Sequence, residues 1–320
     1  MQGTKTNAGT TERYAVAARS DPGRTRSGNE DACGYDLDAG VFVLCDGMGG
    51  AVAGEVASQL TVETFLAELR AAARALSKRD RPQSDAVPRE QEPEPEPERE
   101  PEGEQEREPE QEQEQVSRGA KARLTTGKLP GSGTDPLSDA EHQLHSAVLA
   151  ANRRVYERGV AEPELRGMGT TLVALLMEEA LGRRFAWVAH AGDSRCYRYR
   201  AGELTQLTLD HSLVEEQVRS GQLTPAEAER SPLRSVITRA VGSPHDVEPE
   251  ITHGIVEPGD IYLLCSDGLT RELTDAQISS VIAGELEGQP SMERACERLV
   301  ATANLHGGRD NITCMLVRVL

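Results

Sequence analysis

Aromatic residues are scarce in this sequence, in which Phe, Trp and Tyr together make up only 3% of the 320 residues. Hydrophobic residues still reach 37%, which is enough for a sizeable core, so that core must consist mainly of Leu, Val, Ile and Ala. No run approaches the about 18 apolar residues of a membrane-spanning helix, and residues 1–24 lack the apolar stretch of a secretory signal. We therefore expect a cytoplasmic protein without a membrane partner.

Positive charge is also in deficit, because 35 Lys and Arg residues face 53 Asp and Glu residues, for a net charge of −18. This balance argues against nucleic acid as the main partner, since such binding depends on basic side chains that neutralise phosphates. Glu occupies every even-numbered position from 90 to 114, and residues 89–115 alone carry −10, from 13 Glu and 3 Arg. Outside this run the chain is only moderately acidic.

The Glu run lies in a stretch, residues 80–135, that lacks the pattern of a folded segment. A strict period of two without apolar residues can build neither a helix face nor a strand face, and the interspersed prolines remove backbone donors. We therefore expect a disordered acidic insert rich in Glu, Pro and Gln. It could be a tolerated surface insertion, because lengthening a loop costs little, or a docking or electrostatic exclusion segment for basic partners.

Several catalytic and metal-binding signatures give no support to other chemistries. No HExxH motif, CxxC pair or GxSxG turn occurs, so neither a zinc site nor catalysis by a nucleophilic serine is expected. The six cysteines fall mostly in apolar runs and are expected to be buried thiols in a reducing compartment: Cys33, Cys45, Cys196, Cys265, Cys296 and Cys314.

One apolar run delivers an acidic side chain to a glycine-rich turn. Residues 41–45 are typical of a short buried strand, and they lead directly into Asp46, Gly47 and two further glycines. A carboxylate there, next to backbone without Cβ atoms, would be a good ligand for a hard cation. The alternative is a strand-to-helix turn in which Asp46 caps the next helix.

The same order of residues recurs twice. Residues 259–268 form an apolar strand that ends at Asp267, and Asp310 follows a Gly-Gly turn just before the last apolar run. A single Asp-Gly is more often a plain turn. Three such aspartates, together with Glu30 and Asp31, are too many acids to cluster without cations, because like charges a few ångströms apart destabilise one another.

Taken in order, these blocks resemble the bacterial branch of the metal-dependent type 2C (PPM) Ser/Thr protein phosphatases. They run from Arg26 to the end of the chain and are interrupted once, by the acidic insert. The blocks are Arg26 with Asn29-Glu30-Asp31, Asp46-Gly47-Met48-Gly49-Gly50, Gly167-Met168-Gly169-Thr170-Thr171, Ala191-Gly192-Asp193-Ser194-Arg195, Ser266-Asp267-Gly268-Leu269, and Asp310-Asn311-Ile312-Thr313.

The resemblance implies an α/β (α+β) fold, a four-layer αββα sandwich of two antiparallel β-sheets flanked by helices. Residues 1–79 and 136–320 would form a single phosphatase domain, with a flap segment over residues 210–242. Apolar spacing predicts helices at 53–76 and 138–160. Thr224-Pro225-Ala226-Glu227 has the pattern of a capping box at the start of a short helix in the flap segment.

The resemblance also implies a centre of two metal ions. Asp46 would bridge the two ions with help from the Gly47 carbonyl. Asp267 and Asp310 would complete the coordination of one ion, and Glu30 would bind the other, directly or through water. All of these ligands are oxygens, which suits Mg²⁺ or Mn²⁺. Asp193 would help to bind a third, weaker ion, although it could also be a capping residue.

Catalysis would then be hydrolysis of phosphoserine or phosphothreonine by a metal-activated water, without a covalent intermediate. Arg26 would grip the substrate phosphate with its planar fork of donors, whereas the rival interpretation is a solvated surface charge. Eukaryotic members of the family that this chain resembles usually carry a His two residues after the bridging Asp, where this chain has Met48. Since methionine cannot donate a proton, the general acid is not assigned.

The expected partners are phosphorylated Ser/Thr proteins, among them a Ser/Thr kinase, and the expected state is a monomer. Three alternatives remain open. The chain could be a non-catalytic phosphoprotein-binding member of the same fold, a phosphatase of small phosphate esters, or an interaction protein that acts through the acidic insert.

Overall fold

The computed structural model describes residues 4–79, 136–243, 246–286 and 290–320. The acidic insert expected over residues 80–135 lies outside these described residues, so it stays a prediction. No helix in the described ranges combines the length and the apolar character needed to cross a membrane.

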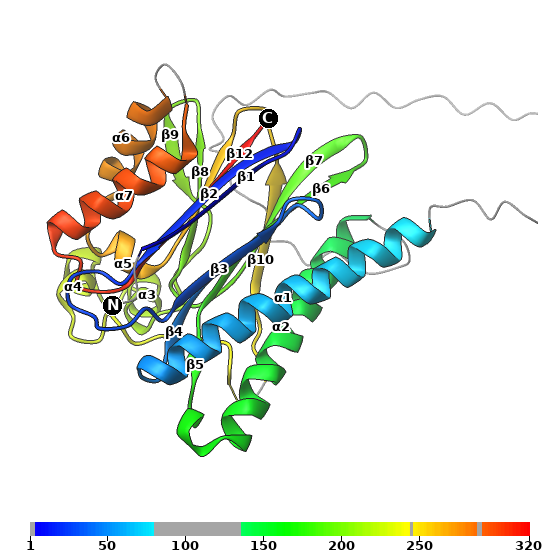
Figure 1. Ribbon diagram of the computed structural model, residues 1–320. Coiled ribbons are helices and arrows are strands. Elements are labelled where there is room, and N and C mark those ends of the chain that lie inside the picture. The colour runs from blue at the N-terminus through cyan, green and yellow to red at the C-terminus, as the bar shows by residue number, and fades with distance from the viewer. Residues whose placement is uncertain (1–3, 80–135, 244–245, 287–289) are drawn as a thin grey trace, which may run out of the picture.

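Two antiparallel sheets form the centre of the molecule (Figure 1), one with strand order β1-β2-β12-β11-β8-β9 and the other with order β10-β7-β6-β4-β3. The first sheet contains β1 (Lys5–Thr10), β2 (Tyr14–Asp21), β8 (Arg195–Arg200), β9 (Glu203–Gln206), β11 (Ile261–Cys265) and β12 (Ile312–Val319). The second contains β3 (Asp31–Asp36), β4 (Val41–Met48), β6 (Leu172–Ala180), β7 (Arg183–Ala191) and β10 (Glu250–Ile255), and the short β5 (Gly169–Thr170) pairs with β4.

Burial on both faces explains why β4 reads as an uninterrupted apolar run. Phe42 and Leu44 join the core between the two sheets, whereas Val41, Val43 and Cys45 join the core beneath the helices. Successive side chains of a strand point to opposite faces, so a strand covered on both sides needs apolar residues at every position. The site that follows this strand is therefore attached to a fully packed element.

Helices cover the outer face of each sheet (Figure 1). The second sheet carries α1 (Ala51–Arg79) and α2 (Pro136–Ala161), and the first carries α6 (Asp275–Leu286) and α7 (Met292–His306). The buried side chains of Phe65 and Leu144 pack these helices onto the second sheet. The expected helix–sheet–sheet–helix order is confirmed, and both predicted long helices extend a few residues beyond the predicted bounds.

The flap segment holds two short helices, α3 (Leu213–Arg219) and α4 (Pro225–Arg230). The predicted capping box at the start of α4 is confirmed, since the Glu227 backbone N–H donates to the Thr224 hydroxyl and the Thr224 N–H donates to the Glu227 carboxylate. The remaining short elements are a 3-10 turn (Pro163–Leu165) and α5 (Asp267–Thr270).

Candidate metal centre

Two acidic residues face each other at one end of the second sheet. Asp46 lies near the end of β4 and Asp31 begins β3, and the antiparallel register pairs them directly. The Ser266 hydroxyl donates to Asp31 Oδ2 at 2.9 Å, which links this pair to the first sheet. The strand end that the sequence marked with Asp46 therefore carries a second carboxylate on the neighbouring strand.

The other predicted ligands reach the same region from different elements. Asp267 begins α5 directly after β11, and Asp310 precedes β12, the strand that pairs with β11. Gly268 lies so close to the Asn311 backbone that a Cβ atom would overlap the carbonyl oxygen there. Asp193 lies in the turn between β7 and β8. The fold thus gathers carboxylates that are far apart in the sequence.

The charges of these acids are mutually unfavourable. Burial, and after it the charges of Asp31 and Asp267, raise the pKa of Asp46 well above its ordinary value. Burial and the charge of Asp193 likewise raise the pKa of Asp267 far above its usual range, although Arg271 lowers it. Burial raises the pKa of Asp31 to about 6. A cluster of this kind gains stability from added positive charge.

Several oxygens in the cluster have no hydrogen-bond partner. These are the Oδ1 atoms of Asp31, Asp193 and Asp267, all of them buried. Buried carboxylate oxygens are normally paired, since leaving them without a partner costs free energy. Buried carboxylate oxygens without a partner, on acids that interact with one another, are the kind of donor that Mg²⁺ or Mn²⁺ binds, so the residues fit such an ion.

The carboxylates are not packed as tightly as the ligands of a single ion. Within the described residues, none of the predicted ligands belongs to a group of three or more whose ligand atoms all lie within 4.8 Å of one another. Arginines occupy part of the site instead. Arg26 Nη2 lies 2.9 Å from Asp310 Oδ2, Arg271 Nη1 lies 3.3 Å from the same oxygen, and Arg271 also forms an ion pair with Asp267.

Glu30 and Gly47 are joined through their backbones. The Gly47 N–H donates to the Glu30 carbonyl at 3.2 Å, and the Ser58 hydroxyl donates to the same oxygen at 2.6 Å. A Cβ on Gly47 would overlap Gly54 O and would lie 2.7 Å from Glu30 O, so only glycine allows this approach. Burial raises the pKa of Glu30, while the Arg26 charge lowers it.

The remaining sequence blocks hold these residues in place. The Asp46 N–H donates to the Thr171 hydroxyl at 3.0 Å, and the Thr170 hydroxyl donates to the Asp46 carbonyl at 2.8 Å. Thr171 Oγ1 is in turn 2.7 Å from Ser194 Oγ. The Asn311 side chain accepts from the Glu30 N–H at 2.8 Å. The Gly-Met-Gly-Thr-Thr, Gly-Asp-Ser and Asp-Asn blocks therefore position the acidic cluster.

Two residues of this site were not among the predicted ligands. Asp31 is placed in the site by its antiparallel pairing with Asp46, a register that was not predicted from the sequence. Arg271 follows Asp267 by one helical turn, a spacing at which side chains meet, but an isolated Asp and Arg four residues apart carry no signal of their own.

A wide cavity opens beside the cluster, with a volume of about 1220 Å³. It lies between the flap segment and the α5–α6 region. Its lining includes Asp193, Asp267, Asp310, Arg271, Arg234 and Arg309.

Cys265 precedes Arg271 by the same six-residue step that separates the nucleophile and arginine of cysteine phosphatases. The Cys265 thiol, however, is completely buried in β11, and burial raises its pKa to about 12. Since the thiolate is the reactive form, this cysteine is inert. The spacing is therefore coincidental.

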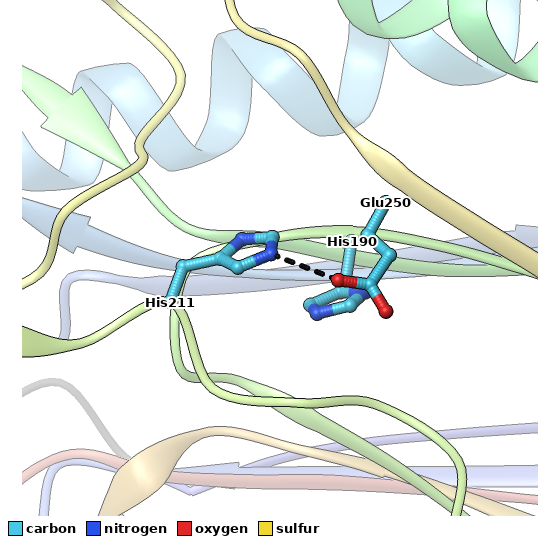
Figure 2. Close-up of side chains that lie close together, drawn as sticks. All are labelled: His190, His211 and Glu250. Carbon is cyan, nitrogen blue, oxygen red and sulfur yellow. Dashed lines mark hydrogen bonds and ion pairs between the residues drawn. The ribbon is translucent and has the colours of Figure 1, made fainter. Parts of the chain in front are cut away.

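A second group of potential ligands, His190, His211 and Glu250, lies at the base of the flap segment (Figure 2), with ligand atoms all within 4.8 Å of one another. The two imidazole rings stack with centroids 4.4 Å apart and planes 11° from parallel. A ring nitrogen binds a metal in the plane of its ring, so two stacked parallel rings cannot both direct a lone pair at one ion.

Hydrogen bonds account for this second group instead. His190 Nε2 lies 2.7 Å from the Leu209 carbonyl, and the Gly192 N–H donates to His211 Nδ1 at 3.3 Å. With its Nδ1 accepting, His211 directs its Nε2 toward Glu250, 3.5 Å away. Burial and the nearby His211 lower the pKa of His190 to about 4. The group joins β7, β10 and the start of the flap segment.

The chain is similar in sequence and in fold to known proteins. The chain is 35% identical over 304 residues to the serine/threonine protein phosphatase PstP of Mycobacterium tuberculosis, covering 95% of this chain and 45% of that protein. It thus spans less than half the length of this relative. The crystal structure of the M. tuberculosis phosphatase PstP/Ppp superposes with a TM-score of 0.67 at 32% identity, covering 96% of this chain and 98% of that one.

A structure of the catalytic domain of PstP in complex with two manganese ions is also similar, with a TM-score of 0.63 at 31% identity, covering 96% of this chain and 99% of that one. Residues 24–316 match the family described as Protein phosphatase 2C. Because this match spans nearly the whole sequence, the chain belongs to the protein phosphatase 2C family.

Proposed function

We propose that this chain is a metal-dependent protein phosphatase that hydrolyses phosphoserine and phosphothreonine in proteins. The observation that carries the proposal is the convergence of Asp46, Asp267 and Asp310, with buried unpaired carboxylate oxygens around them, in a chain of the 2C family. Burial and the charges of neighbouring acids raise the pKa values of Asp46 and Asp267, and shifts of this kind are typical of a functional site.

Two Mg²⁺ or Mn²⁺ ions would be held at this cluster. Asp46 would serve both, Gly47 and Glu30 one of them, and Asp267 and Asp310 the other. Asp193, whose buried Oδ1 has no partner, would help to hold a third ion. Such cations make water a stronger nucleophile near neutral pH and offset negative charge on a phosphoryl group.

The chain's own residues would bind and orient the substrate. Arg26 leaves 49% of its side chain exposed while one of its nitrogens contacts Asp310, so its remaining donors are available to a phosphate at the mouth of the site. Met48 ends β4 opposite Gly169 and has no proton to donate. Protonation of the leaving serine or threonine oxygen therefore falls to a group other than Met48.

The size of the adjoining cavity favours a protein substrate over a small ester. Pockets for small molecules usually have volumes of about 300–1,000 Å³ and enclose most of the ligand. The cavity beside the cluster measures about 1220 Å³ and extends along the flap segment. This volume leaves room for peptide residues next to the phosphorylated one.

We further propose that the substrates include a Ser/Thr kinase and that the protein acts as a monomer in the cytoplasm. All six cysteines are free, and five of them are buried. Free thiols of this number are typical of a reducing compartment.

The test is Mn²⁺-dependent release of phosphate from a phosphothreonine peptide by the wild type, Asp46→Asn and Asp267→Asn. Activity should require the metal and fall by orders of magnitude in both variants. Asp36→Asn is the matched control, because Asp36 lies at the opposite end of β3 and pairs with Arg70. A folded wild-type protein that is inactive with both Mg²⁺ and Mn²⁺ would favour a phosphoprotein-binding role.

Two further comparisons separate the remaining alternatives. A ratio of kcat/KM that favours a phosphopeptide over p-nitrophenyl phosphate supports a protein substrate, and the reverse ratio supports a small ester. Deletion of residues 80–135 tests the interaction hypothesis, which fails if binding to basic partners survives the deletion intact.

A further inference from the structure

Arg271 directs its guanidinium at two of the carboxylates proposed as metal ligands. One of its nitrogens forms an ion pair with Asp267 Oδ2, one helical turn away, and Nη1 lies 3.3 Å from Asp310 Oδ2. The Arg271 side chain is 33% exposed and lines the same cavity as both acids. A single arginine thus neutralises two acids that reach the site from different strands.

The same guanidinium reaches the flap segment. Arg271 Nη2 donates to the Ser235 hydroxyl at 3.2 Å. Ser235 follows α4, in the part of the flap segment that forms one wall of the cavity. The contacts of Arg271 therefore join this wall to the acidic cluster.

These contacts place two kinds of cation in competition. A guanidinium stays charged at every physiological pH, so Arg271 cannot leave the carboxylates by losing its proton. A divalent ion would bind the same two carboxylates: Asp267 Oδ1 has no partner, but Arg271 holds Oδ2 of both Asp267 and Asp310. The two cations would then lie side by side on these carboxylates and repel each other.

We propose that Arg271 is a built-in counter-ion of this centre, which divalent cations must displace from Asp267 and Asp310, and that its displacement releases Ser235 and loosens the flap segment. The inference rests on the metal centre of the proposed function. Metal occupancy would in this way be linked to the mobility of the wall that contacts the substrate. By linkage, anything that pulls the flap segment away from Arg271 would also favour metal binding.

Calorimetric titration of the full, chelator-treated protein with Mn²⁺ tests the competition. Arg271→Met keeps the length of the side chain and removes its charge, so we expect Mn²⁺ to bind about tenfold more tightly. Arg309→Met is the matched control, since Arg309 lines the same cavity but lies 3.9 Å from Glu272 and has no ion pair with a proposed ligand. The control should keep the wild-type affinity.

Affinity that is unchanged or weaker in Arg271→Met overturns the inference. Equal tightening in both variants also overturns it, because the effect would then be a general loss of positive charge. Circular dichroism of each variant verifies that it is folded before titration.

Amide hydrogen exchange over residues 225–236 tests the link to the flap segment. In the wild type, exchange should become faster when Mn²⁺ is added. In Ser235→Ala it should be fast without metal and should no longer respond to Mn²⁺. Exchange in the wild type that is the same with and without metal would contradict the link.

Titration of Asp46→Asn separates this inference from the proposed centre. If Asp46→Asn loses Mn²⁺ binding while Arg271→Met binds like the wild type, only the counter-ion role fails. If Asp46→Asn binds Mn²⁺ as tightly as the wild type, the metal centre is wrongly assigned and both proposals fail.

Discussion

Asp31 and Asp46 are directly opposed residues on neighbouring antiparallel strands, β3 and β4. Like charges in this position destabilise a sheet, because the two side chains are only about 5 Å apart at Cβ. Protonation of a carboxyl or added positive charge nearby relieves this repulsion, and the pair lies where the metal centre is proposed. The repulsion between the two carboxylates lowers stability at this strand end, and the packing of the surrounding core offsets this loss.

The first prediction concerns Asp31→Asn. Without metal at pH 7.5, we expect this variant to be more stable than the wild type by roughly 1–3 kcal/mol, because the raised pKa of Asp31 measures how unfavourable its charge is in the folded protein. Its Mn²⁺ affinity should fall by about 10–100-fold. Urea unfolding in chelator and Mn²⁺ titration measure the two effects. Lower stability without metal would contradict the prediction.

The second prediction concerns the hydroxyl that holds Asp46. Thr171→Val leaves the Asp46 N–H without its acceptor and also removes the contact to Ser194, so it should destabilise the protein by about 1–3 kcal/mol. Thr61→Val is the matched control, because the Thr61 hydroxyl is buried without a partner and its loss should be neutral or stabilising. Urea unfolding of both variants measures the difference, and equal effects would show that Thr171 does not position Asp46.

The third prediction separates function from stability. In Gly54→Ala the new Cβ would overlap Glu30 Oε2, the end of a flexible side chain that can move away, and would lie 3.0 Å from the Gly47 backbone carbon, a tight contact that a small backbone shift relieves. Stability should change little, whereas Mn²⁺-dependent activity should fall at least about tenfold because Glu30 is displaced. Gly284→Ala in α6 meets open space and should gain up to about 1 kcal/mol without loss of activity. Full activity in Gly54→Ala would show that Glu30 is not part of the proposed metal centre.

The fourth prediction concerns pH and the stacked histidines. The pKa of His190 falls from an ordinary 6.5 to about 4 in the folded protein, so the unfolded chain binds its proton more strongly and stability is lost as pH falls between these values. Between pH 7.5 and 5 the loss from His190 should be about 2 kcal/mol. The charges that face this ring are His211, which lowers its pKa, and Glu250 and Asp210, which raise it.

His190→Gln keeps a donor for the Leu209 carbonyl and cannot titrate, so its stability should depend less on pH by that amount. A comparison of the two proteins is needed because Asp31 acts in the opposite direction. Its folded-state pKa lies above the unfolded value, so its contribution rises as pH falls. Urea midpoints of both proteins at the two pH values give the difference. If stability changes with pH in the same way in the wild type and in His190→Gln, protonation of the His190 ring does not destabilise the folded protein.

The sequence was informative where burial on both faces forces a pattern. The apolar run before Asp46 predicted β4, because a strand buried on both faces needs apolar residues throughout. The Thr224–Glu227 spacing predicted the start of α4, because a capping box depends only on residues close together in the sequence. The set of predicted ligands rested on a resemblance. The structure brings those acids toward one another, although it does not draw them into the tight group that a single ion requires.

What the sequence did not reveal depends on tertiary neighbours. The edge strand β1 (Lys5–Thr10) is polar and almost entirely exposed, so it lacks the alternation by which a strand is recognised, and its pairing with β2 defines it. The edge strand β10 (Glu250–Ile255) was missed for a similar reason, since only one of its six residues is buried. The role of Arg271 could not be predicted from the sequence, because its contacts Asp310 and Ser235 lie in distant parts of the chain.

The order of strands in the first sheet has a consequence for synthesis on the ribosome. The strand β12 (Ile312–Val319) inserts between β2 and β11, so β2, which precedes it by most of the sequence, lacks its inner neighbour until β12 has been translated and released from the exit tunnel. Asp310 immediately precedes that strand, so the acidic cluster is completed in the same step. The proposed metal centre would therefore stay incomplete until this segment has been synthesised and has paired with β2 and β11.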